Sequence, residues 1–302
     1  MTSQAILQDV IAYFENKTQS ILQRYGPGPR VHYHTGLVDD PPPPNASIPA
    51  LRERLVASQE RMLWQAADIW NASAHLSGEV LDVGCGLGGG AIFWAQEFGA
   101  RVTAVTCVPS HAGWVSQFAA QSGVGSQIEP LVCDACEVPG ENRFDAAVAV
   151  DSSGYLARKD WLARTASLLR PGGSVFIIDC FLARPTYAEL FDSHWHTRIG
   201  TIDEYLGAAH ECGLKEGSIF DISSRTEHFW TTTLALIEAE SKGVHAGGGT
   251  AIHYARSFKA HCLVRDGLAN GGLRYAMLSF SKDRRDESGS LASRVAEAVS
   301  DS

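Results

Sequence analysis

The spacing of apolar residues predicts two long helices near the start of the chain. Apolar side chains recur every three or four positions over residues 4–24 and again over 48–75. The glycines and prolines of 25–29 end the first helix, and the prolines of 41–44 exclude both helix and inner strand. A surface-crossing linker therefore separates the two helices.

From residue 80 onward, short apolar runs alternate with helical stretches. The runs that predict strands are 80–83, 102–106, 128–133, 146–150 and 174–178, with later strands near 215–223 and 273–281. Helices are predicted at 201–212, 228–240 and 252–267, after an aromatic and histidine-rich segment that ends at His196. The alternation predicts an α/β fold with a doubly wound, mostly parallel sheet and helices on both faces.

These elements divide the chain into three parts. Residues 1–47 hold the N-terminal helix and linker, 48–281 the main domain with a helical cap insert at about 181–212 and 224–270, and 282–302 a polar tail expected to be disordered. The first helix has no core of its own to cover, so we expect it to pack on a neighbouring subunit of a homo-oligomer. A lid over its own binding site is the alternative.

Composition narrows the classes of partner. The 302 residues carry a formal charge of −9 without a basic cluster, which argues against nucleic acid. No stretch reaches the ~18 apolar residues needed to span a bilayer, and the first residues lack the features of a secretory signal. Seven scattered cysteines are typical of reduced thiols. We therefore expect a cytoplasmic protein that binds neither nucleic acid nor membranes.

The most informative motif is Asp82-Val83-Gly84-Cys85-Gly86-Leu87-Gly88, which follows an apolar strand and opens a helix. Glycines there let backbone N–H groups approach a ligand closely, and a helix N-terminus favours negative charge. The spacing differs from the Gly-x-Gly-x-x-Gly of dinucleotide sites, and no phosphate-loop Gly-Lys-Ser/Thr follows. The motif predicts a nucleotide-type cofactor, with a merely structural turn as the alternative.

From this motif onward the chain resembles the class I S-adenosylmethionine-dependent methyltransferases, over roughly residues 55–280. The resemblance implies a seven-stranded Rossmann-like sheet and S-adenosylmethionine as the cofactor. By position, the methionine and ribose part of the cofactor is expected at Asp82, Gly84, Gly86 and Gly88. The turn Arg170-Pro171-Gly172-Gly173 before the fifth strand is also common in this family.

Two further strand ends carry the resemblance. The second strand ends in Val105-Thr106-Cys107-Val108-Pro109-Ser110-His111 and lacks the family's usual acidic ribose ligand. This variant is similar to that of C-methylating relatives, which implies cofactor contacts from Thr106 and His111 instead. Asp134, followed by Ala135, stands where the family usually contacts the adenine amino group.

Other short segments are similar to small-molecule C-methyltransferases. The similarity is to the sterol and geranyl-diphosphate type and to bacterial enzymes that methylate terpenoid alkenes, including the teleocidin prenyl-indole alkaloids. The residues that carry it are Val31-His32-Tyr33-His34-Thr35-Gly36, Ser58-Gln59-Glu60, Val148-Ala149-Val150-Asp151 with Tyr155, and Phe229-Trp230. It implies further cofactor contacts at Tyr33, Gln59 and Asp151, and a hydrophobic small molecule as substrate.

Methylation of an alkene carbon leaves a carbocation, which requires an apolar aromatic pocket and a base. The candidate wall residues are Tyr155, Phe181, Tyr187, Phe191, Trp195, Phe229 and Trp230, each of which has a plain core position as its alternative. Asp151 follows the fourth strand, at the sheet edge where such folds place their sites. It is our first candidate for the base or for a contact to the sulfonium, and a helix N-cap is its alternative.

Several histidines are further candidates for the catalytic base or for metal binding. His194, His196 or His228 is expected to act as a base or to orient the substrate, because an imidazole titrates near neutral pH. The pairs His32/His34 and His194/His196, and the lone Cys133-Asp134-Ala135-Cys136, also permit a metal or redox site. We favour no resident metal, since no second ligand cluster accompanies them.

The acceptor is left open between several classes. Only Arg30, Arg184 and Arg198 are placed to hold a diphosphate, which favours a neutral terpenoid over a prenyl diphosphate with bound Mg²⁺. An O- or N-methyltransferase of small natural products would share the cofactor half and use a histidine as base. A cofactor-binding scaffold without activity is the alternative outside catalysis.

Overall fold

The computed structural model describes residues 3–242 and 249–284, and seven strands form its single sheet, in the order β3-β2-β1-β4-β5-β7-β6. The strands are β1 (Glu79–Val83), β2 (Arg101–Thr106), β3 (Ile128–Val132), β4 (Phe144–Val150), β5 (Leu169–Leu182), β6 (Leu214–Asp221) and β7 (Leu273–Lys282). The first five strands run parallel, and β7 runs antiparallel to both β5 and β6. The predicted doubly wound, mostly parallel sheet is confirmed.

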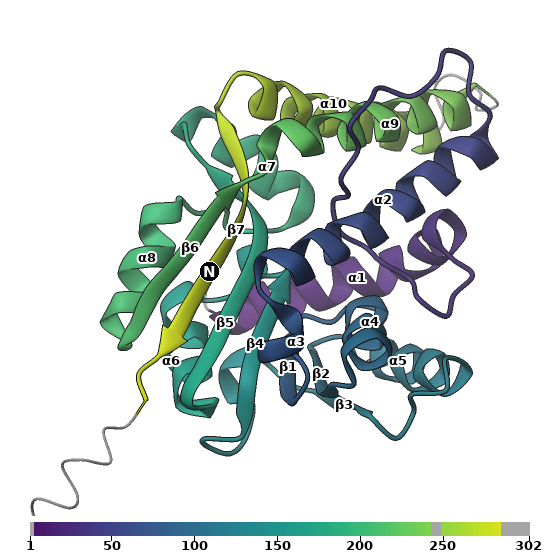
Figure 1. The fold of residues 1–302 in the computed structure, drawn as a ribbon. Helices are drawn as coiled ribbons and strands as arrows, with labels where there is room; N and C mark the ends of the chain where they lie inside the picture. The colour runs from purple at the N-terminus through teal and green to yellow at the C-terminus, as the bar shows by residue number, and fades with distance from the viewer. Residues whose placement is uncertain (1–2, 243–248, 285–302) are drawn as a thin grey trace, which may run out of the picture.

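Helices cover both faces of this sheet (Figure 1). They are α1 (Ser3–Tyr25), α2 (Ile48–Ile69), α3 (Ala72–His75), α4 (Gly89–Phe98), α5 (Pro109–Gln121), α6 (Arg158–Leu168), α7 (Ala188–Trp195), α8 (Ile202–Glu211), α9 (Ser223–Ser241) and α10 (Gly249–Ala269). One apolar core joins the sheet to α2, α4 and α5, and a second joins it to α6 and α8. Alternating side chains along each inner strand feed the two cores.

Two element boundaries differ from the sequence expectation. β5 extends beyond 174–178 at both ends, because β7 pairs with it as far as Leu182 and Phe144 of β4 pairs with Leu169. α7 is not among the helices predicted by range, because its eight residues make only about two turns within the aromatic segment after Pro185. The polar tail expected to be disordered lies mostly outside the described residues.

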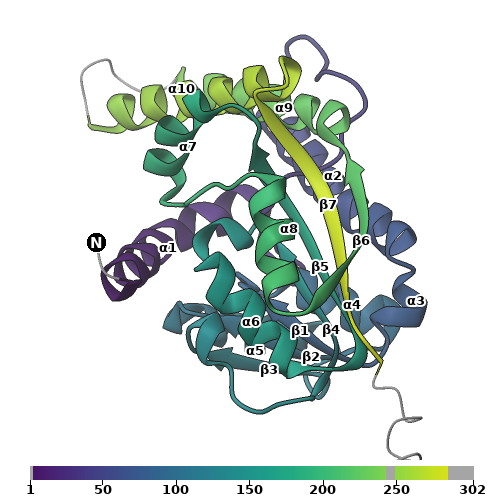
Figure 2. The same ribbon diagram turned by 90° about the vertical axis from the view of Figure 1, so that its left-hand side faces the viewer.

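α7, α9 and α10 lie together beyond one end of the sheet, with α9 and α10 side by side, and α1 runs below α7 (Figure 2). α1 has a surface of its own chain to cover: Val10, Thr18, Ile21 and Tyr25 are buried. Glu15 accepts hydrogen bonds from Ser110 at the start of α5, and Arg24 pairs with Glu240 of α9 at 2.6 Å. The expectation that this helix lacks a core to cover is therefore wrong, while a subunit contact stays a prediction.

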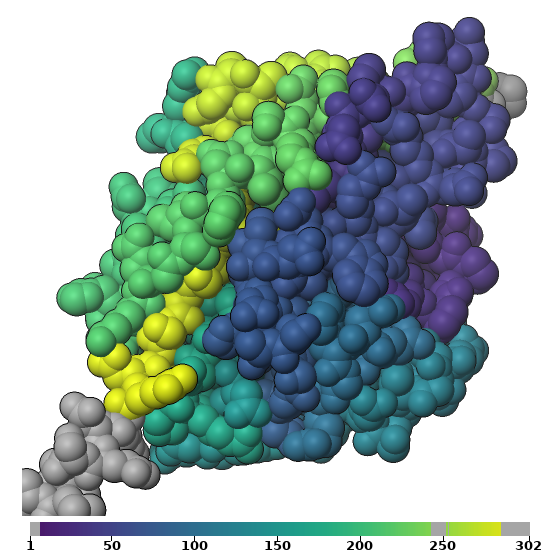
Figure 3. All heavy atoms as spheres, viewed as in Figure 1, coloured from purple at the N-terminus to yellow at the C-terminus, as the bar shows by residue number. Residues whose placement is uncertain are grey.

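In the view of Figure 1, α2 and the connector before it form a broad band across the surface. The space-filling view shows this blue band between the green and yellow surface of β6 and β7 and the teal surface of α4 and α5 (Figure 3). In residues 3–242 and 249–284, no helix is long and apolar enough to cross a membrane.

A substitution at Phe181 tests how much the second apolar core contributes to stability. Its ring is fully buried against Tyr205, with ring centroids 5.1 Å apart. We expect Phe181→Ala to lower the free energy of unfolding by about 3–5 kcal/mol, because the lost apolar contacts leave a cavity. Urea denaturation measures it. The control Phe258→Ala, at a ring that is 40% exposed, should change it by no more than about 0.5 kcal/mol. Equal effects of the two changes would contradict this assignment.

Candidate active site

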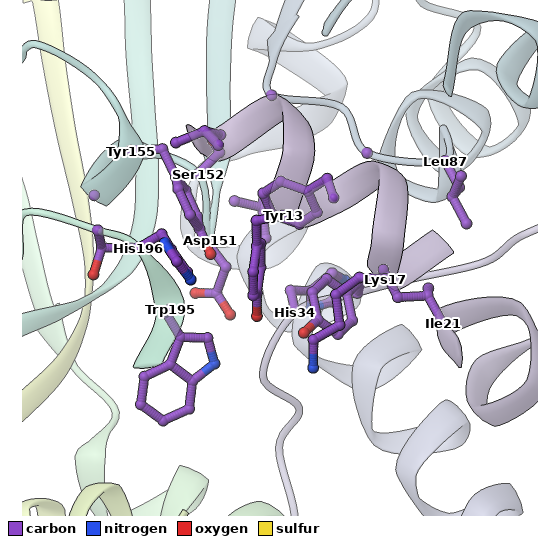
Figure 4. A pocket seen from close by; sticks show the side chains of 18 of the residues that line it. Tyr13, Lys17, Ile21, His34, Leu87, Asp151, Ser152, Tyr155, Trp195 and His196 are labelled. Carbon is purple, nitrogen blue, oxygen red and sulfur yellow. The ribbon is translucent and has the colours of Figure 1, made fainter. Parts of the chain in front are cut away.

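A cavity of about 1100 Å³ lies between the carboxyl ends of the parallel strands and the helices α1, α7 and α9. The loops after β1, β2, β3 and β4 form one end of it, and side chains of α1 run along its length (Figure 4). Open α/β sheets place their ligands at this edge because the strand ends leave a crevice there. The cavity is therefore the candidate active site.

The glycine loop after β1 leaves room for a ligand. Gly84 and Gly86 have φ values of 72° and 54°, which disfavour any side chain. A Cβ on Gly84 would lie 2.5 Å from the Cβ of Ser152, whereas a Cβ on Gly86 would meet nothing within 4 Å. The loop thus presents bare backbone to the cavity at Gly86.

Asp82 supplies an unpaired acceptor beside this loop. Its Oδ2 is buried and has no hydrogen-bond partner among the described residues, and burial raises the pKa of its carboxyl to about 7. A buried carboxylate oxygen without a donor costs free energy, which a ligand's ammonium or hydroxyl groups would offset. This unpaired acceptor, beside the bare backbone at Gly86, fits the amino acid part of S-adenosylmethionine.

The other expected cofactor residues form the rest of this end. The Thr106 hydroxyl accepts a hydrogen bond from the Val108 N–H at 3.1 Å, and Asp134 accepts one from the Cys136 N–H at 2.9 Å. Thr18 donates its hydroxyl proton to the Phe14 carbonyl at 2.8 Å, so His111 Nε2, 2.9 Å from the Thr18 hydroxyl, is the donor in that contact. Burial lowers the pKa of His111 to about 4, so its ring is neutral.

Asp151 sits at the end of β4 in the left-handed region, at φ 49°. The Thr35 N–H donates to its Oδ2 at 2.7 Å, the Tyr275 hydroxyl donates to its Oδ1, and its own N–H donates to the Ile178 carbonyl at 2.8 Å. Burial, followed by the charge of Asp179, raises the pKa of Asp151 to about 7. Such strain and such a pKa are typical of a functional carboxylate.

Most of the predicted site residues reach the cavity. It is lined by Tyr33, Asp82, Gly84, Gly86, Thr106, His111, Asp134, Ala135, Asp151, Tyr155, Phe191, His194, Trp195, His196, Phe229 and Trp230. Gln59, Gly88 and His228 do not line it. Gln59 donates to the His34 carbonyl at 2.7 Å and so holds residues 31–36, which we call the entry segment.

The expectation that Phe181 and Tyr187 line the cavity is wrong. Phe181 belongs to the second apolar core, because its position on β5 faces α8. Tyr187 packs over Gly267 and Gly272 at the rim of β7, and its hydroxyl accepts from Asn270 at 2.7 Å.

The sequence interpretation missed the rings that α1 adds to the wall. Tyr13 lies 4.8 Å from the His196 ring and Phe14 lies 5.3 Å from the Tyr155 ring, centroid to centroid. Opposite them, Trp195 contacts Trp230 at 5.9 Å. The signal was present as aromatic residues within the first helix, but the sequence does not say where that helix folds back.

Charges are unevenly distributed in the cavity. Asp82, Asp134, Asp151 and Asp179 lie at the sheet end, whereas Lys17, Arg24 and Arg52 lie along the helices. Glu240 pairs with both Arg24 and Arg52, but Lys17 has no ion pair in the described part of the chain. Burial, followed by the charge of Arg24, lowers the pKa of Lys17.

Of the arginines considered for a diphosphate, only Arg198 lines the cavity. Arg30 pairs with Glu60 and Glu97, and Arg184 donates to the Asn270 carbonyl. His32 is bound to Glu60 at 2.8 Å. Within the described ranges, no group of three or more His, Cys, Asp or Glu residues is arranged to hold a metal ion.

Comparisons with known proteins show which sequences and folds this chain resembles. Residues 80–173 match the family model described as a methyltransferase domain. The geranyl diphosphate 2-C-methyltransferase of Streptomyces lasalocidi is 26% identical, over 74% of this chain and 78% of that protein. The chloroplastic tocopherol O-methyltransferase of Arabidopsis thaliana is 23% identical, over 77% and 70% of the two chains.

Solved structures share the fold. A geranyl diphosphate C-methyltransferase from Streptomyces coelicolor A3(2), in complex with Mg²⁺, a thiolo analogue of geranyl diphosphate and S-adenosyl-L-homocysteine, aligns with a TM-score of 0.76 at 18% identity, over 92% of this chain and 98% of that one. The cyclase SpnF aligns with a TM-score of 0.70 at 22% identity, over 94% and 97% of the chains. The fold alone thus leaves the acceptor open. The matched methyltransferase domain, together with relatives and structural neighbours that are methyltransferases, supports an S-adenosylmethionine-dependent methyltransferase.

Proposed function

We propose that this enzyme transfers a methyl group to an alkene carbon of a terpenoid or prenylated natural product, such as a prenyl-indole alkaloid. The observation that carries the proposal is the position of Asp151, a half-buried carboxylate that faces an aromatic cavity at the edge of the cofactor end. The relationship to geranyl diphosphate C-methyltransferases supports it. Proton loss or cyclisation would follow the transfer.

The cofactor end would hold S-adenosylmethionine, whose sulfonium supplies an electrophilic methyl group. Asp82, Gly84 and Gly86 would receive the methionine and ribose part, because they combine an unpaired carboxylate oxygen with bare backbone. Thr106, His111, Asp134 and Ala135 would enclose the adenosine. Gly88 serves packing instead, since a Cβ there would lie 3.2 Å from Val115.

The aromatic wall would stabilise the cation formed on the acceptor. When the new C–C bond forms from the alkene's electron pair, the C–S bond breaks and the adjacent carbon becomes positive. The faces of Tyr13, Tyr155, Trp195 and Trp230 attract such a charge and keep water from it. The wall therefore favours proton loss over capture by water.

Asp151 would take the proton. The C–H bond next to the cation breaks, its electron pair becomes the new double bond, and the proton moves to the carboxylate. The Thr35 N–H and the Tyr275 hydroxyl fix the carboxylate's orientation. With a pKa of about 7, Asp151 is ionised in about half of the molecules at neutral pH and in most above it.

A prenyl diphosphate is the second candidate acceptor, and Lys17 favours it. This half-buried cation has no ion pair in the described residues and lines the cavity away from the acidic end. Mg²⁺ would then arrive with the substrate, as a relative's structure holds both. Four aspartates lie at the sheet end of the cavity, and their negative charge still favours a neutral acceptor there.

A turnover assay with methyl-labelled S-adenosylmethionine tests the proposed function. The acceptors are a prenylated indole alkaloid, geranyl diphosphate with and without Mg²⁺, and a small phenol. We expect label in a new carbon–carbon bond of a terpenoid acceptor, located by mass spectrometry and NMR. Label on the phenol oxygen alone would overturn C-methylation and leave the cofactor assignment intact.

Gly86→Ala tests the cofactor position. Gly86 and Gly123 both have positive φ, and a Cβ on either meets nothing within 4 Å, but only Gly86 lines the cavity. Both changes should destabilise the protein by about 1–2 kcal/mol. Calorimetry should show at least about a tenfold loss of S-adenosylmethionine affinity for Gly86→Ala alone, a loss of about 1.4 kcal/mol. Equal affinities in the two variants would refute the placement.

Asp151→Asn tests the base. We expect turnover to fall by about 100-fold or more, because an amide cannot take the proton. Wild-type turnover should decline as the pH falls through about 7, where the carboxylate protonates, and this acidic limb should vanish in the variant. Asp160→Asn, at an exposed position, is the control. Turnover near the wild-type value with cofactor bound would remove Asp151 from the mechanism.

A further inference from the structure

Asp179 occupies a position on β5 where an apolar residue is expected. Its alternate neighbours Ile177 and Phe181 are fully buried in the second core. Asp179 itself is only 8% exposed, and its pKa is raised by that burial. A carboxylate on this face costs desolvation free energy that an apolar side chain would not. Its presence therefore calls for a local cause.

The carboxylate is bound to the turn that follows β4. Its Oδ2 accepts from the Ser153 hydroxyl at 2.6 Å and the Gly154 N–H at 3.2 Å, and its Oδ1 accepts from the Cys180 N–H at 2.8 Å. Since Ser153 gives its proton to Asp179, the Tyr205 hydroxyl, 2.8 Å away, donates to Ser153. A directed chain of donors thus leads from α8 through the turn to Asp179.

The same turn carries Asp151 and Tyr155 into the cavity. On one face of the sheet, Tyr275 from the first core donates to Asp151. On the other face, Asp179 holds Ser153 and Gly154. Because Asp151 is in a left-handed conformation, the turn needs such restraint from both sides.

Asp179 also brings a second carboxylate to the cavity beside Asp151. The groups that act on the two carboxylates are tyrosines, a thiol and neutral donors: Tyr155, Tyr205, Tyr275, Cys180, Thr35 and Ser153. Arg158 stacks on the far side of the Tyr205 ring at 4.6 Å and does not reach the carboxylates in any described contact. None of the groups that act on the two carboxylates carries a positive charge, so the negative charge of Asp179 repels that of Asp151.

We propose that Asp179 is a positioning residue: it holds the 151–155 turn and places a second negative charge beside Asp151. This inference rests on the proposed role of Asp151 as the proton acceptor. The added charge raises the proton affinity of Asp151 into the range where it accepts a proton near neutral pH. It also adds to the negative potential that the cation on the acceptor experiences.

The first test measures the titration of Asp151 by the ¹³C chemical shift of its carboxyl carbon, assigned with the Asp151→Asn variant. In Asp179→Asn, the midpoint for Asp151 should move to lower pH by about one unit, because the neighbouring charge is gone. Tyr205→Phe keeps that charge and removes only the donor to Ser153, so its midpoint should stay within about 0.2 units of wild type. An unmoved midpoint in Asp179→Asn overturns the proposal.

The second readout is the pH profile of kcat on the acceptor that wild type methylates. The acidic limb should move down by a similar amount in Asp179→Asn, with kcat about tenfold lower on the plateau and KM for the cofactor unchanged. A merely structural role would lower kcat without moving the limb. If wild type does not C-methylate any acceptor, the proposed function is wrong. The titration of Asp151 still tests whether the charge of Asp179 raises its proton affinity.

If Asp179→Asn does not fold, the wild-type titration decides alone. Two coupled carboxylates give a curve with two inflections, because each proton taken up changes the neighbour's affinity. Two inflections in the Asp151 signal support the pair. A single inflection near the ordinary value for aspartate overturns it.

Discussion

The position of the Asp151 carboxylate is the constraint on which the site depends. Three segments far apart in the sequence meet at this residue: the entry segment through the Thr35 N–H, β7 through Tyr275, and β5 through the Ile178 carbonyl. Each contact fixes one direction of a residue whose backbone would otherwise relax out of its left-handed conformation. Two strands of the sheet and the segment before α2 thus hold one residue at the end of β4.

Much of the fold could be predicted from the sequence because its cause is local. The apolar runs of β1 to β5 and the glycine loop after Val83 follow from period and from backbone freedom alone. The length of β5 could not be predicted, since the antiparallel partner that extends it lies almost a hundred residues later, in β7. Non-local pairing leaves no signature in a short window of sequence.

The site also has a part that could be predicted from the sequence and a part that could not. The cofactor end was predictable because its residues follow strand ends whose place in the sheet is fixed by topology. Asp179 and Tyr13 were missed for different reasons: the first stands inside a strand that reads as apolar, and the second lies on a helix whose docking surface no motif records. Phe181 was assigned to the wall because aromatic residues near a site do not reveal which face of their strand they occupy.

α1 has one more consequence. Its 23 residues supply aromatic wall on the acceptor side, yet it is tied to the cofactor side through Glu15 on Ser110 and Thr18 on His111. The aromatic wall and the cofactor end therefore come from separate stretches of the sequence, and these two contacts join them. Exchange of this one segment between related chains, with Glu15 and Thr18 retained, changes the shape presented to the acceptor and leaves the sheet and its loops untouched. If the proposed acceptor wall is correct, substitutions within residues 3–25 would alter the range of acceptors while the glycine loop and the other strand-end loops stay the same.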